Sequence, residues 1–122
     1  MIELLRGFPE NVVAVSCTGQ VTRKDYDTVL IPALEKALKA HEKVRLLYEA
    51  GPDFDGVDAG AAWEDFKIGM EHYFRWERVA VITDVEWIKH AARLFSFAVP
   101  GAMRVYPTEE AAKARLWITQ AA

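Results

Sequence analysis

Three apolar runs constrain the fold of this chain more than any other feature. They cover residues 12–17, 44–50 and 79–83, and stretches with helical spacing of apolar residues separate them. A strand that is apolar along its whole length needs cover on both faces, as a central strand of a parallel sheet has. Parallel neighbours need a crossover between them, which is usually a helix. The pattern therefore predicts an α/β fold in which Gly19 ends the first of these strands.

Two shorter strands complete the predicted sheet. Residues 2–5 precede a cluster of turn-forming residues, and residues 103–106 follow Pro100 and Gly101. The first strand is expected to run antiparallel to the others. The predicted architecture is a single domain over residues 1–122, with a five-stranded, mixed, mainly parallel sheet flanked by about four helices.

The helices are predicted from apolar spacing and from residues that begin or interrupt helices. Thr22 is expected to cap the first helix, and Asp25 suits its positive end. Pro32 must kink this helix or begin a second piece, because proline lacks an N–H and clashes with the preceding turn. The remaining helices are expected over residues 61–74, 86–98 and 107–120.

Charge, cysteine content and hydropathy exclude several classes of protein. The net charge is −3, from 15 basic and 18 acidic residues, and no stretch concentrates Lys and Arg, so nucleic acid is not expected as a partner. Cys17 is the single cysteine and is expected to be a small buried hydrophobe. No run approaches the roughly 18 apolar residues of a membrane span. The start lacks the pattern of a secretory signal, so a soluble, cytoplasmic protein is expected.

Several short strings carry a resemblance to a known family. They are Asp-Tyr at 25–26, Ile-Pro-Ala-Leu at 31–34, Arg-Leu-Leu at 45–47, Trp-Glu-Asp-Phe-Lys at 63–67 and Glu-Arg-Val-Ala-Val-Ile at 77–82. In their order and spacing, over nearly the whole chain, these strings resemble the SpoIIAA-like family. The resemblance implies the STAS-type fold of the anti-anti-sigma factors, an architecture also compared with lipid-binding CRAL-TRIO domains.

One departure from that family limits what the resemblance implies. Phosphorylated STAS domains carry an Asp-Ser-Ser-Gly string before the second helix, and its serine is the switch. The corresponding residues 51–60 of this chain contain no serine or threonine. Phosphorylation of this loop would need a hydroxyl, so the phosphoserine switch is not expected here.

The same loop carries three aspartates that invite a metal hypothesis. Asp53, Asp55 and Asp58 lie after a strand and before a predicted helix, where α/β folds bind ligands. Alignment with an EF-hand loop puts Gly51 and Ala62 at two essential ligand positions. We therefore expect no metal, and expect these acids to cap the following helix.

No catalytic constellation is evident. Asp65 and His72 are two turns apart on one predicted helix, and Asp84 follows the strand at residues 79–83. The chain has no serine in a nucleophile turn, no second histidine at ligand spacing and no glycine-rich phosphate cradle. We expect a protein without enzymatic activity and without a cofactor.

Aromatic residues on two predicted helices point to a binding function. The helix at residues 86–98 has an apolar arc flanked by Lys89 and Arg93, which is typical of an interfacial helix and, more often, of a helix that covers a sheet. The leading hypothesis is that the protein is a non-catalytic domain that binds a small apolar or lipid-like ligand and contacts membranes transiently. The predicted ligand-binding residues are Trp63, Phe66, Met70, Trp87, Phe95 and Phe97.

Two other hypotheses stay open. The alternative to ligand binding is a protein–protein interaction module that forms a homodimer through Ile68 and Phe97, because exposed aromatic residues mark such surfaces. STAS relatives generally act by docking onto partners, which favours the same hypothesis. An enzyme that uses Asp65, His72 or Asp84 ranks last, since nothing converges on a reacting atom.

Overall fold

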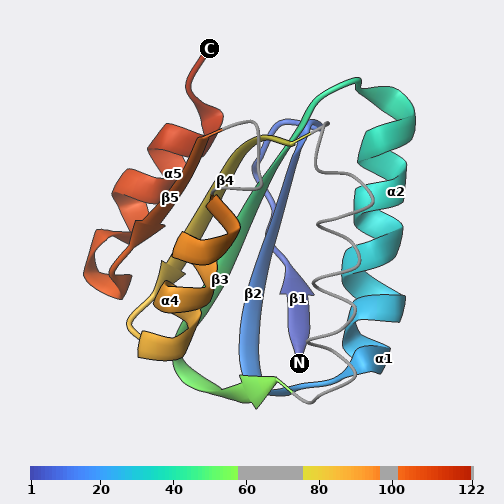
Figure 1. The fold of residues 1–122 in the computed structure, drawn as a ribbon. Helices are drawn as coiled ribbons and strands as arrows, with labels where there is room; N and C mark the ends of the chain where they lie inside the picture. Colours follow the sequence, from blue (N-terminus) through green and yellow to red (C-terminus); the bar gives the residue numbers. More distant parts are fainter. Residues whose placement is uncertain (58–75, 97–101, 122) are drawn as a thin grey trace.

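A computed structural model describes residues 1–57, 76–96 and 102–121 of the chain, and its centre is a five-stranded sheet (Figure 1). The strand order follows the sequence, β1-β2-β3-β4-β5. β1 is antiparallel to β2 and all other pairs are parallel, which confirms the predicted mixed, mainly parallel sheet. The strands are β1 (Ile2–Leu4), β2 (Val12–Val21), β3 (Val44–Val57), β4 (Trp76–Thr83) and β5 (Ala102–Tyr106).

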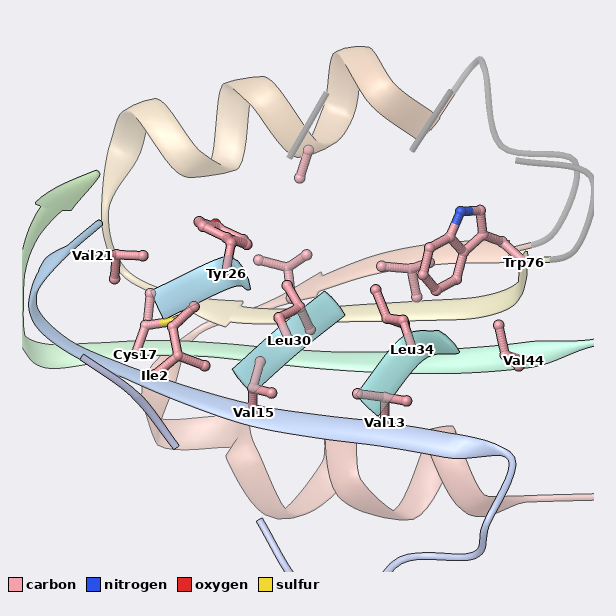
Figure 2. Close-up of a cluster of buried hydrophobic side chains, with 14 of the residues drawn as sticks. Ile2, Val13, Val15, Cys17, Val21, Tyr26, Leu30, Leu34, Val44 and Trp76 are labelled. Carbon is pink, nitrogen blue, oxygen red and sulfur yellow. The ribbon is translucent and has the colours of Figure 1, made fainter. Parts of the chain in front are cut away.

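The handedness of the connections decides which face of the sheet each helix covers. Crossovers between parallel strands are almost always right-handed, so successive crossovers in one direction place their helices on the same face. Accordingly α2 and α4 lie on one face, whereas α5 follows the last strand and covers the other (Figures 1 and 2). The described helices are α1 (Arg23–Asp25), η1 (Tyr26–Leu30), α2 (Ile31–Ala40), α4 (Glu86–Ser96), η3 (Thr108–Glu110) and α5 (Ala111–Thr119).

Successive side chains of each strand point to opposite faces of the sheet, so the buried side chains form two layers. The larger layer lies under α2 and α4 (Figure 2), with Tyr26 and Cys17 at one end and Trp76 and Val44 at the other. Cys17 is fully buried, as predicted. The smaller layer lies under α5 and consists of Val12, Ala14, Leu47, Ala80, Ile82, Ala114, Trp117 and Ile118.

Two strands run further than the sequence predicted. β2 does not end at Gly19, because this glycine adopts a φ of +59° at a shift in the pairing register and the strand continues to Val21. β3 continues beyond Ala50 to Val57, and Phe54 pairs with Gly19. The prediction of an irregular stretch from residue 51 was therefore wrong for its first seven residues, since β2 provides a hydrogen-bonding partner for them.

The other predicted boundaries differ by a few residues. β1 ends at Leu4, and β4 begins at Trp76 rather than at residue 79. The last helix begins as a 3₁₀ turn at Thr108 and its α-helical part ends at Thr119. The helix predicted over residues 61–74 and the end of the helix predicted to reach residue 98 lie outside the described residues.

The first helical segment follows the local chemistry of its residues. Thr22 and Asp25 form a reciprocal capping box, with Thr22 N–H donating to Asp25 Oδ2 at 2.9 Å and Asp25 N–H donating to Thr22 Oγ1 at 3.3 Å. The π-helical turn η1 follows, in which Ile31 N–H bonds to the Tyr26 carbonyl. Pro32 lies directly after this turn, at the start of α2. The predicted interruption at Pro32 takes the form of this π-helical turn: the helical backbone continues through Leu30 and Ile31, and the wider turn accommodates a residue that donates no hydrogen bond.

A buried arginine fixes the end of α5 to the sheet. Arg45 on β3 is 6% exposed and its guanidinium forms an ion pair with Glu77 on β4. Its Nη1 donates to the backbone carbonyls of Ile118, at 2.9 Å, and Gln120. The last carbonyls of a helix lack partners within the helix and carry partial negative charge, so a cation is favourable there.

Replacing Arg45 with methionine should destabilise the fold strongly. Methionine keeps much of the packing volume, but it removes the donors to α5 and leaves the Glu77 carboxylate without its cation. We expect the free energy of unfolding to fall by roughly 3 kcal/mol, as for other broken buried ion pairs. Urea denaturation monitored by circular dichroism measures this change.

The matched control is Arg115→Met, which removes the ion pair between Arg115 and Glu49 at 3.1 Å. Because the Arg115 side chain is 49% exposed, water screens this pair and the loss should stay below about 1 kcal/mol. Equal losses in the two variants would contradict the role assigned to Arg45.

Candidate functional site

The carboxyl ends of β2, β3, β4 and β5 meet at one edge of the sheet, which we call the carboxyl edge. Because these four strands are parallel, the segments that follow them are brought together there. Open α/β sheets usually bind their ligands at this edge. The described residues that concern a candidate site lie here, at the ends of β2 and β3 and at the start of α4.

An exposed tryptophan packs on a buried phenylalanine at the carboxyl edge. Trp87 is the second residue of α4 and is 52% exposed, whereas Phe54 on β3 is 9% exposed. Their ring centroids are 6.2 Å apart and the rings are tilted by 41°. This distance is typical of aromatic pairs that attract one another. Phe54 thus holds one side of the Trp87 ring while solvent reaches the other.

The predicted ligand-binding residues are described only in part. Trp87 is placed at the surface, at the first turn of α4. The other predicted residues, Trp63, Phe66, Met70 and Phe97, lie outside the described residues, and so does the side chain of Phe95. The predicted binding of an apolar ligand by this set of residues therefore stays a prediction.

Phe54 is a candidate site residue that the sequence reasoning missed. It stands between two aspartates, and these acids directed attention to metal binding and to helix capping. Asp53 and Asp55 are in fact exposed residues of β3, on either side of the buried Phe54. This alternation of exposed and buried positions is the pattern of a strand and could have revealed Phe54. Asp58 and the helix that the acids were expected to cap lie outside the described residues.

A pair of tyrosine hydroxyls lies inside the larger layer. The hydroxyl oxygens of Tyr26 on η1 and Tyr48 on β3 are 3.0 Å apart, and either can donate. Tyr26 is fully buried, near the end of this core that Figure 2 shows with Cys17 and Val21. Buried tyrosines usually find a partner for their hydroxyl, and this pair satisfies that need. It brings polar groups into an otherwise apolar layer.

Two carboxylates at the carboxyl edge, those of Asp84 and Asp25, accept hydrogen bonds from backbone N–H groups. Asp84 accepts a hydrogen bond from Thr108 N–H at 3.1 Å, and this bond holds the pKa of the exposed carboxyl below its usual value. A carboxylate with a lowered pKa is a weak general base. The other residues of the enzyme hypothesis, Asp65 and His72, lie outside the described residues.

Asp25 has a comparable environment at the end of β2. The Thr22 N–H is the main cause that lowers the pKa of Asp25, and the Met1 ammonium, 3.5 Å from its carboxylate, acts in the same direction. The same ammonium donates to the carbonyl of Thr18 at 2.6 Å. These contacts give Asp25 a structural role in closing this corner of the fold.

Within the described residues, no three His, Cys, Asp or Glu side chains gather as a metal site would require. None of the described helices has the length and hydropathy that crossing a membrane requires.

Comparison with known proteins decides the family. A family model described as SpoIIAA-like matches residues 12–119. The chain belongs to the SpoIIAA-like family. A structural match agrees: the crystal structure of an uncharacterized protein from the DUF3478 family with a SpoIIAA-like fold, from Shewanella loihica PV-4. It is 28% identical, with a TM-score of 0.71, over 97% of this chain and 92% of that chain. No curated protein matches the chain.

The comparison confirms the family and the fold that the short strings implied. In this SpoIIAA-like protein the residues that correspond to the switch loop begin as part of β3, where Gly51–Val57 carries no hydroxyl side chain.

Replacing Asp25 with asparagine should remove a pH-dependent part of the stability. The pKa of Asp25 is lower in the folded chain than its ordinary value of 3.8, so the carboxylate stabilises the fold above pH 3.8. This contribution disappears as the pH falls through the folded value. We expect Asp25→Asn to lower the free energy of unfolding by about 1 kcal/mol at pH 7, as the loss of a helix cap does, and by less at pH 3.

Urea unfolding at both pH values measures the difference. Asp27→Asn is the matched control, because the Asp27 side chain is 50% exposed and its contact with Arg23 is 3.8 Å long. A loss in Asp25→Asn that is the same at pH 7 and pH 3 would show that the charge of Asp25 does not contribute.

Proposed function

We propose that this SpoIIAA-like protein is a non-catalytic domain that binds a small apolar or lipid-like ligand at the carboxyl edge. The observation that carries the proposal is the half-exposed Trp87 ring resting on the buried Phe54. Covering the exposed part of such a ring removes a large apolar area from water, at roughly 25 cal/mol per Å². Aromatic anchors of this kind dominate many binding sites.

The surroundings of Trp87 support an apolar ligand. α4 contributes Ile88 and Ala92 to the larger buried layer, so Trp87 stands at the margin of an extensive apolar region. The hydroxyls of Tyr26 and Tyr48 add a few polar groups to this layer. Sites for small apolar molecules are mostly apolar with a small number of polar contacts.

The titratable groups at the carboxyl edge support a role without catalysis. Asp25 and Asp84 each accept a hydrogen bond from a backbone N–H that lowers the pKa of the carboxyl. Each therefore stays charged at neutral pH and has a structural partner, whereas a general base is best with a pKa near the working pH.

The proposal includes transient membrane contact by a protein that resides in the cytoplasm. A tryptophan ring with one apolar side and one solvated side suits the boundary between lipid head groups and acyl chains. α4 also carries the exposed Arg93, whose charge favours anionic head groups. Extraction of a ligand from a bilayer would then occur where Trp87 touches the surface.

The exposed apolar residues of β1 favour a second candidate, a self-associating interaction module. β1 is an edge strand of three residues, and Met1 and Leu4 are 54% and 51% exposed. An edge strand with apolar residues beside it is a surface on which a second copy can pair. In this alternative the protein is a homodimer. Light scattering should then show a dimer for the wild type and a monomer for Leu4→Lys. Ile68 and Phe97, the residues first expected in the interface, lie outside the described residues.

The ligand proposal predicts a specific loss on removal of the Trp87 ring. Trp87→Ala should weaken binding of the fluorescent fatty acid cis-parinaric acid by about tenfold or more, which corresponds to roughly 1.4 kcal/mol. The fold should stay intact, because Trp87 is a surface residue. Fluorescence titration measures the affinity, and native mass spectrometry of freshly purified protein reports a co-purified ligand.

Leu116→Ala is the matched control. Leu116 on α5 is 63% exposed and lies on the helix that covers the opposite face of the sheet, so its removal should leave the affinity unchanged. Binding that is equally strong in the wild type and in Trp87→Ala would contradict the proposed site. A wild type that neither binds the fatty acid nor retains a ligand would contradict the proposed function.

A further inference from the structure

Three arginines on adjacent strands face α5, on the side of the sheet opposite α4. Arg45 on β3 is the register partner of Arg78 on β4, and Arg104 on β5 is the partner of Ala80, two residues beyond Arg78. Arg45 is neutralised by Glu77. Among the described residues, no carboxylate forms an ion pair with Arg78 or with Arg104. Two arginines for which the described part of the chain provides no carboxylate partner thus lie on the same face of the sheet, in a chain whose net charge is −3.

The ring of Trp117 on α5 holds these two guanidinium groups in place. The central carbon of the Arg78 guanidinium is 5.2 Å from the centroid of the ring, and that of Arg104 is 4.7 Å from it. Trp117 itself is 7% exposed, so the ring is a fixed support. Arginine stacks favourably on tryptophan through cation–π attraction, and stacking leaves the N–H groups in the guanidinium plane able to donate.

Arg104 is not needed to cap the end of α5, so capping does not explain its role. Arg45 donates to the carbonyls of Ile118 and Gln120, and Arg78 Nη1 donates to the Trp117 carbonyl at 2.7 Å and to the Gln120 carbonyl at 3.3 Å. These bonds already provide donors for the carbonyls of Trp117 and Ile118 in the last turn of the helix. Within the described part of the chain, Arg104 has the stacking contact with Trp117 and no hydrogen bond to an acceptor. Arg104 is an exposed residue.

We propose that Arg78, Trp117 and Arg104 form a binding site for an oxyanion, the phosphate or carboxylate group of a small molecule. The planar guanidinium fork matches both groups with two parallel N–H···O bonds. The Trp117 ring limits the motion of both side chains before the anion arrives, which reduces the entropy that binding costs. The site lies on the face of the sheet that α5 covers, so it is separate from the carboxyl edge and from the proposed apolar ligand.

Arg104 has an alternative explanation, the protection of an edge strand, and it predicts a different experimental result. β5 is an edge strand, and a charged side chain on an edge discourages pairing with another chain. If this were the whole role of Arg104, anions would act on the protein only through ionic strength. Measurements at constant ionic strength therefore separate the two roles.

The test is a titration of the ¹⁵N-labelled protein with inorganic phosphate, and separately with succinate, at constant ionic strength maintained with sodium chloride. We expect saturable shifts of the amide resonances around Arg104 and Trp117. Arg104→Gln should weaken the apparent affinity at least tenfold while the rest of the spectrum shows an intact fold. Saturation by both anions would indicate a general oxyanion site, and saturation by phosphate alone a phosphate site.

Lys36→Gln is the matched control, because it removes an exposed cation from α2 on the opposite face of the sheet, away from both proposed sites. This variant should bind like the wild type. Shifts that do not saturate, that spread over the whole surface or that persist unchanged in Arg104→Gln would overturn the proposal.

Discussion

The buried guanidinium of Arg45 is the interaction on which the layer beneath α5 depends. α5 follows β5, and among the described residues no further strand comes after it to fix its direction. Its attachment comes from the carbonyls of Ile118 and Gln120, which accept hydrogen bonds from Arg45, and from the packing of Trp117 and Ile118 on β3 and β4. Since Glu77 neutralises the buried charge, the arginine can stay in this layer without the full cost of an isolated ion. The same geometry places Arg78 beside Trp117.

Chain connectivity decides which helices cover the other face of the sheet. Because the strands succeed one another in sequence order and the crossovers share one hand, α2 and α4 lie together on the face opposite α5. The start of α4 is thereby brought to the carboxyl edge, where the long β3 reaches it with Phe54. The two proposed sites are consequences of these two faces: an aromatic anchor beside the larger apolar layer, and an arginine pair beside the smaller one.

Local chemistry could be predicted from the residues with good accuracy. The capping box of Thr22 and Asp25 depends on four consecutive residues, and the interruption of the regular α-helix before Pro32 depends on one missing N–H, so neither needs the rest of the fold. Gly19 and Phe54 were predicted incorrectly for the opposite reason. Their conformation depends on pairing between β2 and β3. The aromatic set was chosen by helical spacing, and of its members the structure describes the side chain of Trp87.

By itself, the sequence determined the class of fold, the mainly parallel sheet and the family, because alternating apolar runs and helical spacing are properties of neighbouring residues. It also excluded a phosphoserine switch at residues 51–60, because no hydroxyl stands there. Only the tertiary structure decided that Arg45 is buried against Glu77 and that Phe54 supports Trp87. It alone also brought Arg78 and Arg104 to the same ring. Each of these contacts joins residues that are far apart in the chain, and strand pairing and helix packing bring them together.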